Sequence, residues 1–297
     1  MDLSQREREA CFISTLSLGR GRGLMDEVNQ SREDVRIGGM ESTPTGNGLG
    51  AVVAAPFAAL AFLTVLPVPA STRFRAHMGW AVACFPLVGA AMGASLGALD
   101  HLLAPVFPSS VSAALLVVGL LALTGALHLD ALMDSFDGLF GGKNPAARLA
   151  IMKDSRVGSF GIAAAVSLLL IEYGSLLPLP SADRSTGLIL ALVLSRWAMA
   201  VVLWAFPAAT ESGLAAGLKP LVRWPHAVLA SLIVLAIVSF VGGARGLGLG
   251  LLGLLIAVLG GRFAVARLGG VNGDVCGGLG EVVEASVLVS WVALAAR

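Results

Sequence analysis

The sequence predicts an all-α, polytopic integral membrane protein with about seven transmembrane helices, within a range of six to eight. Of its 297 residues, 56% are hydrophobic and only 13% are charged, whereas a soluble domain usually carries about 25% charged residues. From Leu49 onward, apolar runs alternate with short polar loops, which is the pattern of bilayer-crossing helices. We therefore expect the lipid bilayer as a partner. The net charge of +1 gives no reason to expect a nucleic acid.

Residues 1–48 differ from the rest in being polar, charged and without sustained apolar periodicity. We expect a disordered N-terminal extension over 1–48, dispensable for activity, and a single transmembrane domain over 49–297. The extension lacks the apolar segment of a secretory signal. Met25 and Met40 both precede the first apolar run, so a translation start at either one stays open.

The apolar runs follow one another at the spacing of helices joined by short loops. They cover residues 49–66, 78–99, 111–129, 158–177, 186–206, 227–241, 246–260 and 282–296. The second to fifth runs meet or approach the roughly 20 residues that a crossing helix needs, and the last three are shorter. Gly89, Gly93 and Gly97 form a stripe of small residues in the second run. Such a stripe favours close packing within one subunit, and it leaves a homo-oligomer open.

The distribution of loop cations predicts which end of the bundle faces the cytoplasm. The loops after the first, third, fifth and seventh runs carry most of the cations: Arg73, Arg75, Lys143, Arg148, Lys153, Arg156, Lys219, Arg223, Arg262 and Arg267. The other internal loops carry Arg184 and Arg245. The positive-inside rule places the first set in the cytoplasm. The arginines of the extension favour the same side, which is consistent if the first run, interrupted by Pro56, is re-entrant or interfacial.

The most informative stretch runs from His128 to Gly138 and carries three carboxylates. Asp130, Asp134 and Asp137 are spaced i, i+4, i+7, which places them on one face of a helix. Like charges stacked in this way repel, so the arrangement needs a counter-ion, and Mg²⁺ is the hard cation that oxygen ligands suit best. Carboxylates at membrane depth are costly unless they are functional. We therefore favour a metal site over a solvated acidic helix end.

A second charged segment, Lys153-Asp154-Ser155-Arg156, follows shortly after. We expect a helix from about Pro145, since proline suits a first helical turn, to a break between Arg156 and Gly158. Lys153 and Arg156 would then share a face and could hold phosphate groups, although ordinary juxtamembrane cations remain the alternative. Carboxylate-held metal beside such cations is typical of phosphoryl or phosphodiester transfer.

A third constellation lies near the C-terminus, where a glycine-rich loop precedes the last apolar run. It comprises Gly269, Gly270, Asn272, Gly273, Asp274, Gly277, Gly278, Gly280, Glu281 and Glu284. Glycines let a backbone approach a ligand closely, and Asp274 could complete a metal or ribose site; a flexible connector is the alternative. Arg196 and Glu172 interrupt apolar runs, and we expect each to pair with another buried group. The scattered three cysteines and four histidines favour neither a disulfide framework nor a zinc site.

These motifs together resemble the cobalamin synthase family, the adenosylcobinamide-GDP ribazoletransferases. The resemblance runs from about Phe57 to the C-terminus and rests on the order and spacing of five segments: Phe62–Pro69, Phe85–Gly89, Thr124–Gly138, Ile151–Gly158 with Gly161, and Gly269–Asp274 with Gly277 and Glu281. The departures are mild, and none removes a carboxylate. Ala126 and Ala131 replace frequent glycines, while Ser135, Asn272 and Val275 replace frequent threonines.

The resemblance implies an enzyme, with 49–297 as its catalytic domain in the bacterial cytoplasmic (inner) membrane. Its substrates would be adenosylcobinamide-GDP and α-ribazole or its 5′-phosphate, and its products GMP and adenosylcobalamin or its 5′-phosphate, in the last steps of cobalamin biosynthesis. Residue roles follow by motif: Asp130, Asp134 and Asp137 would bind the cofactor Mg²⁺, Lys153 and Arg156 would hold phosphates, Asp154 or His128 would act as the base, and Asn272, Gly273 and Asp274 would bind the second substrate or complete the metal site.

Two other classes of protein remain as alternatives. A secondary transporter could use intramembrane carboxylates as a cation site, but transporters usually show internal repeats, and no second copy of the 128–138 motif is present. A CDP-alcohol phosphotransferase would continue Asp137-Gly138 with a different pattern, which Phe140-Gly141-Gly142 breaks.

Overall fold

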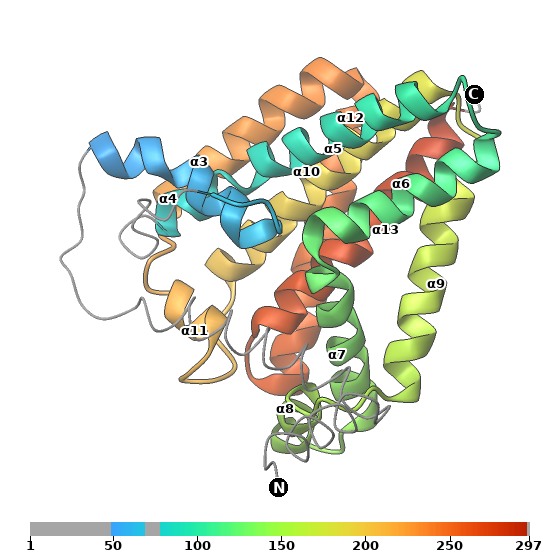
Figure 1. The fold of residues 1–297 in the computed structure, drawn as a ribbon. Coiled ribbons are helices and arrows are strands. Elements are labelled where there is room, and N and C mark those ends of the chain that lie inside the picture. The colour runs from blue at the N-terminus through green and yellow to red at the C-terminus, as the bar shows by residue number, and fades with distance from the viewer. Residues whose placement is uncertain (1–48, 69–77, 296–297) are drawn as a thin grey trace, which may run out of the picture. The chain divides into compact units, whose positions relative to one another are not determined.

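The computed structural model describes residues 49–68 and 78–295, with side chains from Val53 onward, and its elements are helices (Figure 1). They are α3 (Leu49–Leu63), α4 (Met78–Ala83), α5 (Phe85–Leu103), α6 (Ser109–Thr124), α7 (Leu127–Gly141), α8 (Pro145–Met152), α9 (Ser159–Leu176), α10 (Ser181–Ala205), α11 (Leu214–Leu218), α12 (Trp224–Leu268) and α13 (Gly273–Ala295). The prediction of an all-α membrane protein is confirmed. The expected disordered extension lies outside the described residues.

Within the described ranges, five helices are long and apolar enough to cross a membrane: α5, α9, α10, α12 and α13. The pair α6 and α7 adds a sixth if the two form one broken span. This count takes α12 as one helix, although α12 joins two helices across a kink at Gly243, one for each of the predicted runs 227–241 and 246–260. The first run forms only the 15 residues of α3, which is shorter than a crossing helix needs.

Helix α12 is interrupted by a kink at Gly243. This residue has φ 55° and ψ −139°, which are not helical values, and glycine adopts such a conformation without a Cβ clash. A Cβ added at Gly246 would lie 2.2 Å from the carbonyl oxygen of Val238, so the backbone on the two sides of the kink comes into close contact. The predicted runs 227–241 and 246–260 therefore form two helices that meet at Gly243.

The break between α6 and α7 turns the chain by 87° and sets the direction of the acidic helix. Gly125 and Ala126 both have positive φ, 62° and 56°. The left-handed conformation costs an alanine roughly 1–2 kcal/mol, a strain that a glycine at this position would not carry. The predicted run 111–129 contains this break, so its last residues belong to α7.

Helix α10 forms the centre of the bundle and packs against α5, α13 and α12. Of the 18-residue apolar stretch of α10, 83% is buried inside the protein. Gly89 and Gly93 let α5 approach the α10 backbone, since a Cβ at either position would lie within 2.6 Å of backbone atoms of Leu192 or Ile189. The glycine stripe thus serves packing within the subunit, as predicted.

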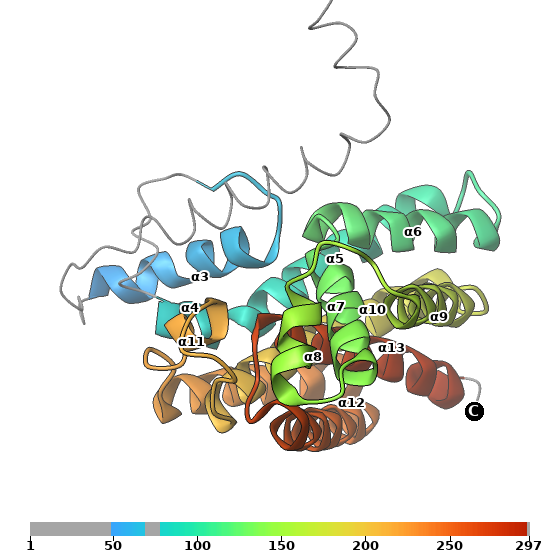
Figure 2. The ribbon, with the colours of Figure 1, turned by 90° about the horizontal axis from the view of Figure 1, so that it is seen from below.

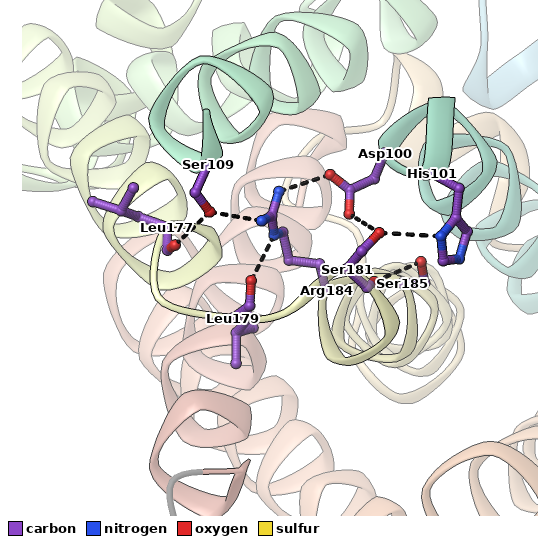
Figure 3. Close-up of polar contacts among 8 residues, drawn as sticks. All are labelled: Asp100, His101, Ser109, Leu177, Leu179, Ser181, Arg184 and Ser185. Carbon is purple, nitrogen blue, oxygen red and sulfur yellow. Dashed lines mark hydrogen bonds and ion pairs between the residues drawn. The ribbon is translucent and has the colours of Figure 1, made fainter. Parts of the chain in front are cut away.

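One end of the bundle is held by a buried network around Asp100 and Arg184 (Figure 3). Arg184 donates from Nη1 to Asp100 Oδ1 at 2.7 Å, from Nη2 to Ser109 Oγ at 2.7 Å and from Nε to the carbonyl oxygen of Leu179 at 2.8 Å. Ser181 Oγ donates to Asp100 Oδ2 at 2.6 Å. The network connects the end of α5, the starts of α6 and α10 and the loop after α9, and we call it the Arg184 network.

Candidate active site

The acidic residues lie at the other end of the bundle, on α7. The structure places Asp130, Asp134 and Asp137 within one helix, as the spacing predicts. Asp130 is exposed, Asp134 is half-buried and Asp137 is buried. Figure 2 looks onto this end of the bundle, where α7 and α8 face the viewer.

Asp137 has a defined structural role at the start of α9. Its Oδ2 accepts a hydrogen bond from the backbone N–H of Gly158 at 2.7 Å, and its Oδ1 accepts one from Gly161 at 2.8 Å. A carboxylate there caps the helix N-terminus and interacts favourably with the helix dipole. A Cβ at either glycine would lie within 2.5 Å of the Asp137 carboxylate. The two glycines of this motif are therefore required for the carboxylate to approach.

Helix α13 crosses α7 at two glycines and brings Asp274 to the acidic face. A Cβ at Gly277 would lie 2.7 Å from Ala131 Cβ, and one at Gly278 would lie 3.2 Å from Leu132 Cα. The negative charges of Asp130, Asp274 and Asp137 all act on the carboxyl group of Asp134. Four carboxylates from two helices, far apart in sequence, thus form one acidic centre.

The two glycine- and charge-rich segments of the sequence meet at this end, as further contacts show. Arg148 Nη1 donates to the carbonyl oxygen of Arg267 at 3.0 Å, and Asn272 Nδ2 lies 3.4 Å from Met152 Sδ. The backbone of Ala209 donates to Val271 at 2.9 Å, and Val271 donates to Pro207 at 2.8 Å. The loops after the third, fifth and seventh runs, which the cation pattern assigned to one side, are therefore neighbours in space, and Arg73 and Arg75 of the first loop lie outside the described residues.

The loop after α8 corrects one prediction. Helix α8 begins at Pro145, as expected, but it ends at Met152, so Lys153 and Arg156 do not share a helical face. The side chain of Asp154 accepts from the backbone N–H of Arg156 at 3.0 Å, and this local turn competes with the helix. The Asp154 carboxylate also pairs with the guanidinium of Arg156 at 2.7 Å. Hydrogen bonds from Arg156 lower the pKa of Asp154 to about 2.

His128 lies against α13, whereas Asp137, on the same helix α7, lies against the start of α9. Its side chain is 2% exposed and lies against Gly277 of α13, where a Cβ would be 3.7 Å from His128 Cδ2. Asp137, in contrast, faces the start of α9. Asp154, the other predicted candidate for the base, lies in the loop after α8.

Asn272 orients Asp274 at the start of α13. Its Nδ2 donates to Asp274 Oδ2 at 2.8 Å, and its Oδ1 accepts from the backbone N–H of Val275 at 2.9 Å. Asparagine thus performs the capping role that a threonine would also fill at this position. Gly273 lies between them and packs against Leu214 of α11.

One cation near the site was not singled out by the sequence pattern. Lys219, just after α11, donates from Nζ to the carbonyl oxygens of Leu203 and Trp204 at 3.2 and 2.5 Å. Its charge acts on Cys276, as does that of Asp274. Only its membership of the basic set of loops pointed to this end of the bundle.

The donor chemistry of the acidic centre fits Mg²⁺. Among the described residues, no three His, Cys, Asp or Glu side chains are arranged to hold a metal ion by themselves. Mg²⁺ does not need such a cage, because it keeps several waters and usually binds one or two carboxylates plus substrate phosphates. Hard carboxylate oxygens that repel one another, as around Asp134, match that mode of binding.

Comparison with known proteins places this arrangement in one family. The sequence model of cobalamin-5-phosphate synthase (CobS) matches residues 55–292. An adenosylcobinamide-GDP ribazoletransferase of Pseudomonas paraeruginosa is 41% identical over 241 residues, covering 78% of this chain and 95% of that protein. The protein of the same name from Desulforamulus reducens is 36% identical over 231 residues, covering 77% and 92%. No solved structure matches the chain.

Proposed function

The chain belongs to the cobalamin-5-phosphate synthase family, and we propose that its acidic centre on α7 and α13 is the active site. The activity is that of an adenosylcobinamide-GDP ribazoletransferase. A hydroxyl of α-ribazole, or of its 5′-phosphate, attacks the cobinamide-side phosphorus of adenosylcobinamide-GDP, and the bond to GMP breaks. The family thus selects a transferase over the transporter and the CDP-alcohol enzyme.

The observation that carries the site assignment is the surplus of negative charge around Asp134. Asp130, Asp137 and Asp274 act on it from two helices, whereas elsewhere in the described chain the buried Asp100 has an arginine partner. Carboxylates gathered at one point repel one another, and a cationic ligand relieves that repulsion. A diphosphate substrate with a divalent cation supplies that ligand.

Asp130, Asp134 and Asp137 hold Mg²⁺ in this proposal, and Asp274 contributes from α13. When bound, Mg²⁺ neutralises charge on the diphosphate oxygens. Asp137 also holds the start of α9 through the amides of Gly158 and Gly161. It therefore positions the loop that carries Lys153 and Arg156 relative to the acidic helix.

Lys153 and Arg156 bind phosphate oxygens of the substrate. The Arg156 side chain is 84% exposed, so its guanidinium is free to turn from Asp154 to a phosphate. Once the guanidinium of Arg156 has left, the largest cause that lowers the pKa of Asp154 is removed, and this carboxylate becomes a better base for the nucleophilic hydroxyl. The buried position of His128 favours Asp154 over His128 for that role.

The basic end of the bundle faces the cytoplasm in this proposal, in a bacterial inner membrane. The loops carrying Lys143, Arg148, Lys219 and Arg267 converge at this end, and the Arg184 network holds the other end. Positively charged loops remain on the cytoplasmic side during insertion. Nucleotide substrates would reach the site from that side.

The test is GMP release from adenosylcobinamide-GDP and α-ribazole by purified protein. Asp134→Asn should lower the rate roughly a hundredfold to a thousandfold, about 3–4 kcal/mol of transition-state stabilisation. The matched control is Asp183→Asn, at the opposite end of the bundle, which should keep wild-type turnover. Normal turnover in Asp134→Asn at limiting Mg²⁺ would contradict the site.

A further inference from the structure

A second group of acidic residues lies inside the bundle, apart from the active site. Glu172 of α9, Arg196 of α10, and Glu281 and Glu284 of α13 are 1%, 0%, 6% and 0% exposed. All four belong to helices that are apolar and long enough to cross the membrane. Glu281 follows Asp274 by seven residues, or about 10 Å along the helix axis. We call these four residues the interior cluster.

The interior cluster has one cation and three carboxyl groups. Arg196 Nη1 pairs with Glu284 Oε2 at 3.0 Å, which confirms the expected pairing of Arg196 with a buried group. The charges that act on Glu172 are those of Glu284, Glu281 and Arg196. If all three carboxyls were ionised, two negative charges would remain uncompensated in a medium of low dielectric constant, which is strongly unfavourable.

Protons can neutralise the cluster without a coordinated metal ion. Among the described residues, no group of three His, Cys, Asp or Glu side chains is arranged to bind one. A proton needs no such geometry, because a protonated carboxyl is neutral and gains a hydrogen-bond donor. Two protons, one on Glu172 and one on Glu281, balance the charge and leave the Arg196–Glu284 pair intact.

Several polar atoms of the interior cluster also lack a partner within the described protein. They are Glu172 Oε1, Glu284 Oε1, Arg196 Nε and Arg196 Nη2, and each is buried. A buried polar group without a hydrogen-bond partner destabilises the folded protein. Arginine nitrogens only donate, and carboxylate oxygens accept. Water, which does both, is the ligand that joins such groups, and buried waters typically make about three hydrogen bonds.

We propose that the interior cluster is a binding site for protons and water within the membrane part of the enzyme. Glu284 is ionised and paired with Arg196, Glu172 and Glu281 each carry a proton, and water connects Arg196 Nε and Nη2 to the carboxyl groups. The protons come from solvent as the protein folds, and no bond other than O–H forms. The cluster thereby joins α9, α10 and α13 without binding a metal cation.

The three glutamates should respond differently to the same substitution. Glu172→Gln and Glu281→Gln replace a neutral group with a neutral amide, so each variant should accumulate normally and unfold within a few degrees of wild type in detergent. Each should also lose a protonated-carboxyl band from the infrared difference spectrum. Glu284→Gln leaves Arg196 unpaired and should unfold at a clearly lower temperature. Asp100→Asn, which removes the ionised partner of Arg184, is the matched control and should behave like Glu284→Gln.

Three results would overturn the proposal. The first is equal destabilisation by all three glutamine substitutions, or failure of Glu172→Gln to accumulate. The second is an infrared spectrum in which neither Glu172→Gln nor Glu281→Gln removes a protonated-carboxyl band. The third is an increase in unfolding temperature with Na⁺ or Mg²⁺ that Glu172→Gln abolishes and Asp134→Asn retains, because a metal cation would then occupy the cluster.

Discussion

The two ends of the helix bundle use buried carboxylates in opposite ways. At one end, both oxygens of Asp100 and all three nitrogens of Arg184 have hydrogen-bond partners (Figure 3). At the other end, four carboxylates gather, and the negative charges of Asp130, Asp137 and Asp274 all act on Asp134. A buried carboxylate with a complete set of hydrogen-bond partners therefore holds helices together, whereas several carboxylates gathered at one point form a site that can bind a cationic ligand.

The largest expected effect comes from removing the cation of the Arg184 network. Arg184→Leu leaves Asp100 buried and unpaired, which should lower the free energy of unfolding by about 3–5 kcal/mol. Thermal unfolding in detergent measures the loss. The rate of GMP release per folded molecule should stay near that of wild type, since the network lies at the end opposite the acidic centre. A loss of turnover with normal stability would contradict the assignment of a purely structural role to the Arg184 network.

Two variants of α7, at Asp137 and Asp130, separate the structural role of its carboxylates from their role in catalysis. Asp137→Asn should both slow GMP release and lower the free energy of unfolding by about 1–2 kcal/mol, because an amide cannot accept from Gly158 and Gly161 with both atoms. Asp130→Asn, on the exposed part of the same helix face, should slow GMP release and leave the unfolding temperature unchanged. Equal stability losses in the two variants would show that Asp137 has no special structural part.

The smallest expected effect is a gain in stability of the protein from a substitution at the break between α6 and α7. Ala126→Gly removes the Cβ from a residue with φ 56° and should raise the free energy of unfolding by about 1 kcal/mol. GMP release should be unchanged, because the turn conformation stays the same. If Ala126→Gly lowers the unfolding temperature, the strain assigned to the break between α6 and α7 is not present.

The acidic helix could be predicted from sequence because its signal is local. The spacing of Asp130, Asp134 and Asp137 fixes one helix face whatever surrounds it. The early end of α8 was missed because no glycine or proline follows Met152 until Gly158, and the turn depends on a side-chain bond from Asp154. Long-range partners carry no local signal either. Asp137 bonds amides 21 and 24 residues away, and Arg184 pairs across 84 residues.

The number of spans shows the same limit. Apolar runs reveal where helices occur, and the described helices cover the predicted runs. The sequence places a break at Gly242–Arg245 between two apolar runs, and the backbone leaves helical geometry within that segment, at Gly243. Glycine permits both a loop and a kink, so composition alone does not distinguish them.

The most direct test of a metal site at the acidic centre is Mg²⁺ binding, measured by titration calorimetry in the presence of adenosylcobinamide-GDP and without α-ribazole. If the surplus carboxylates are the metal site, Asp134→Asn should weaken Mg²⁺ binding by at least roughly tenfold, or about 1.4 kcal/mol, and Asp183→Asn should bind like wild type. Undiminished Mg²⁺ binding by a folded Asp134→Asn variant would contradict the account.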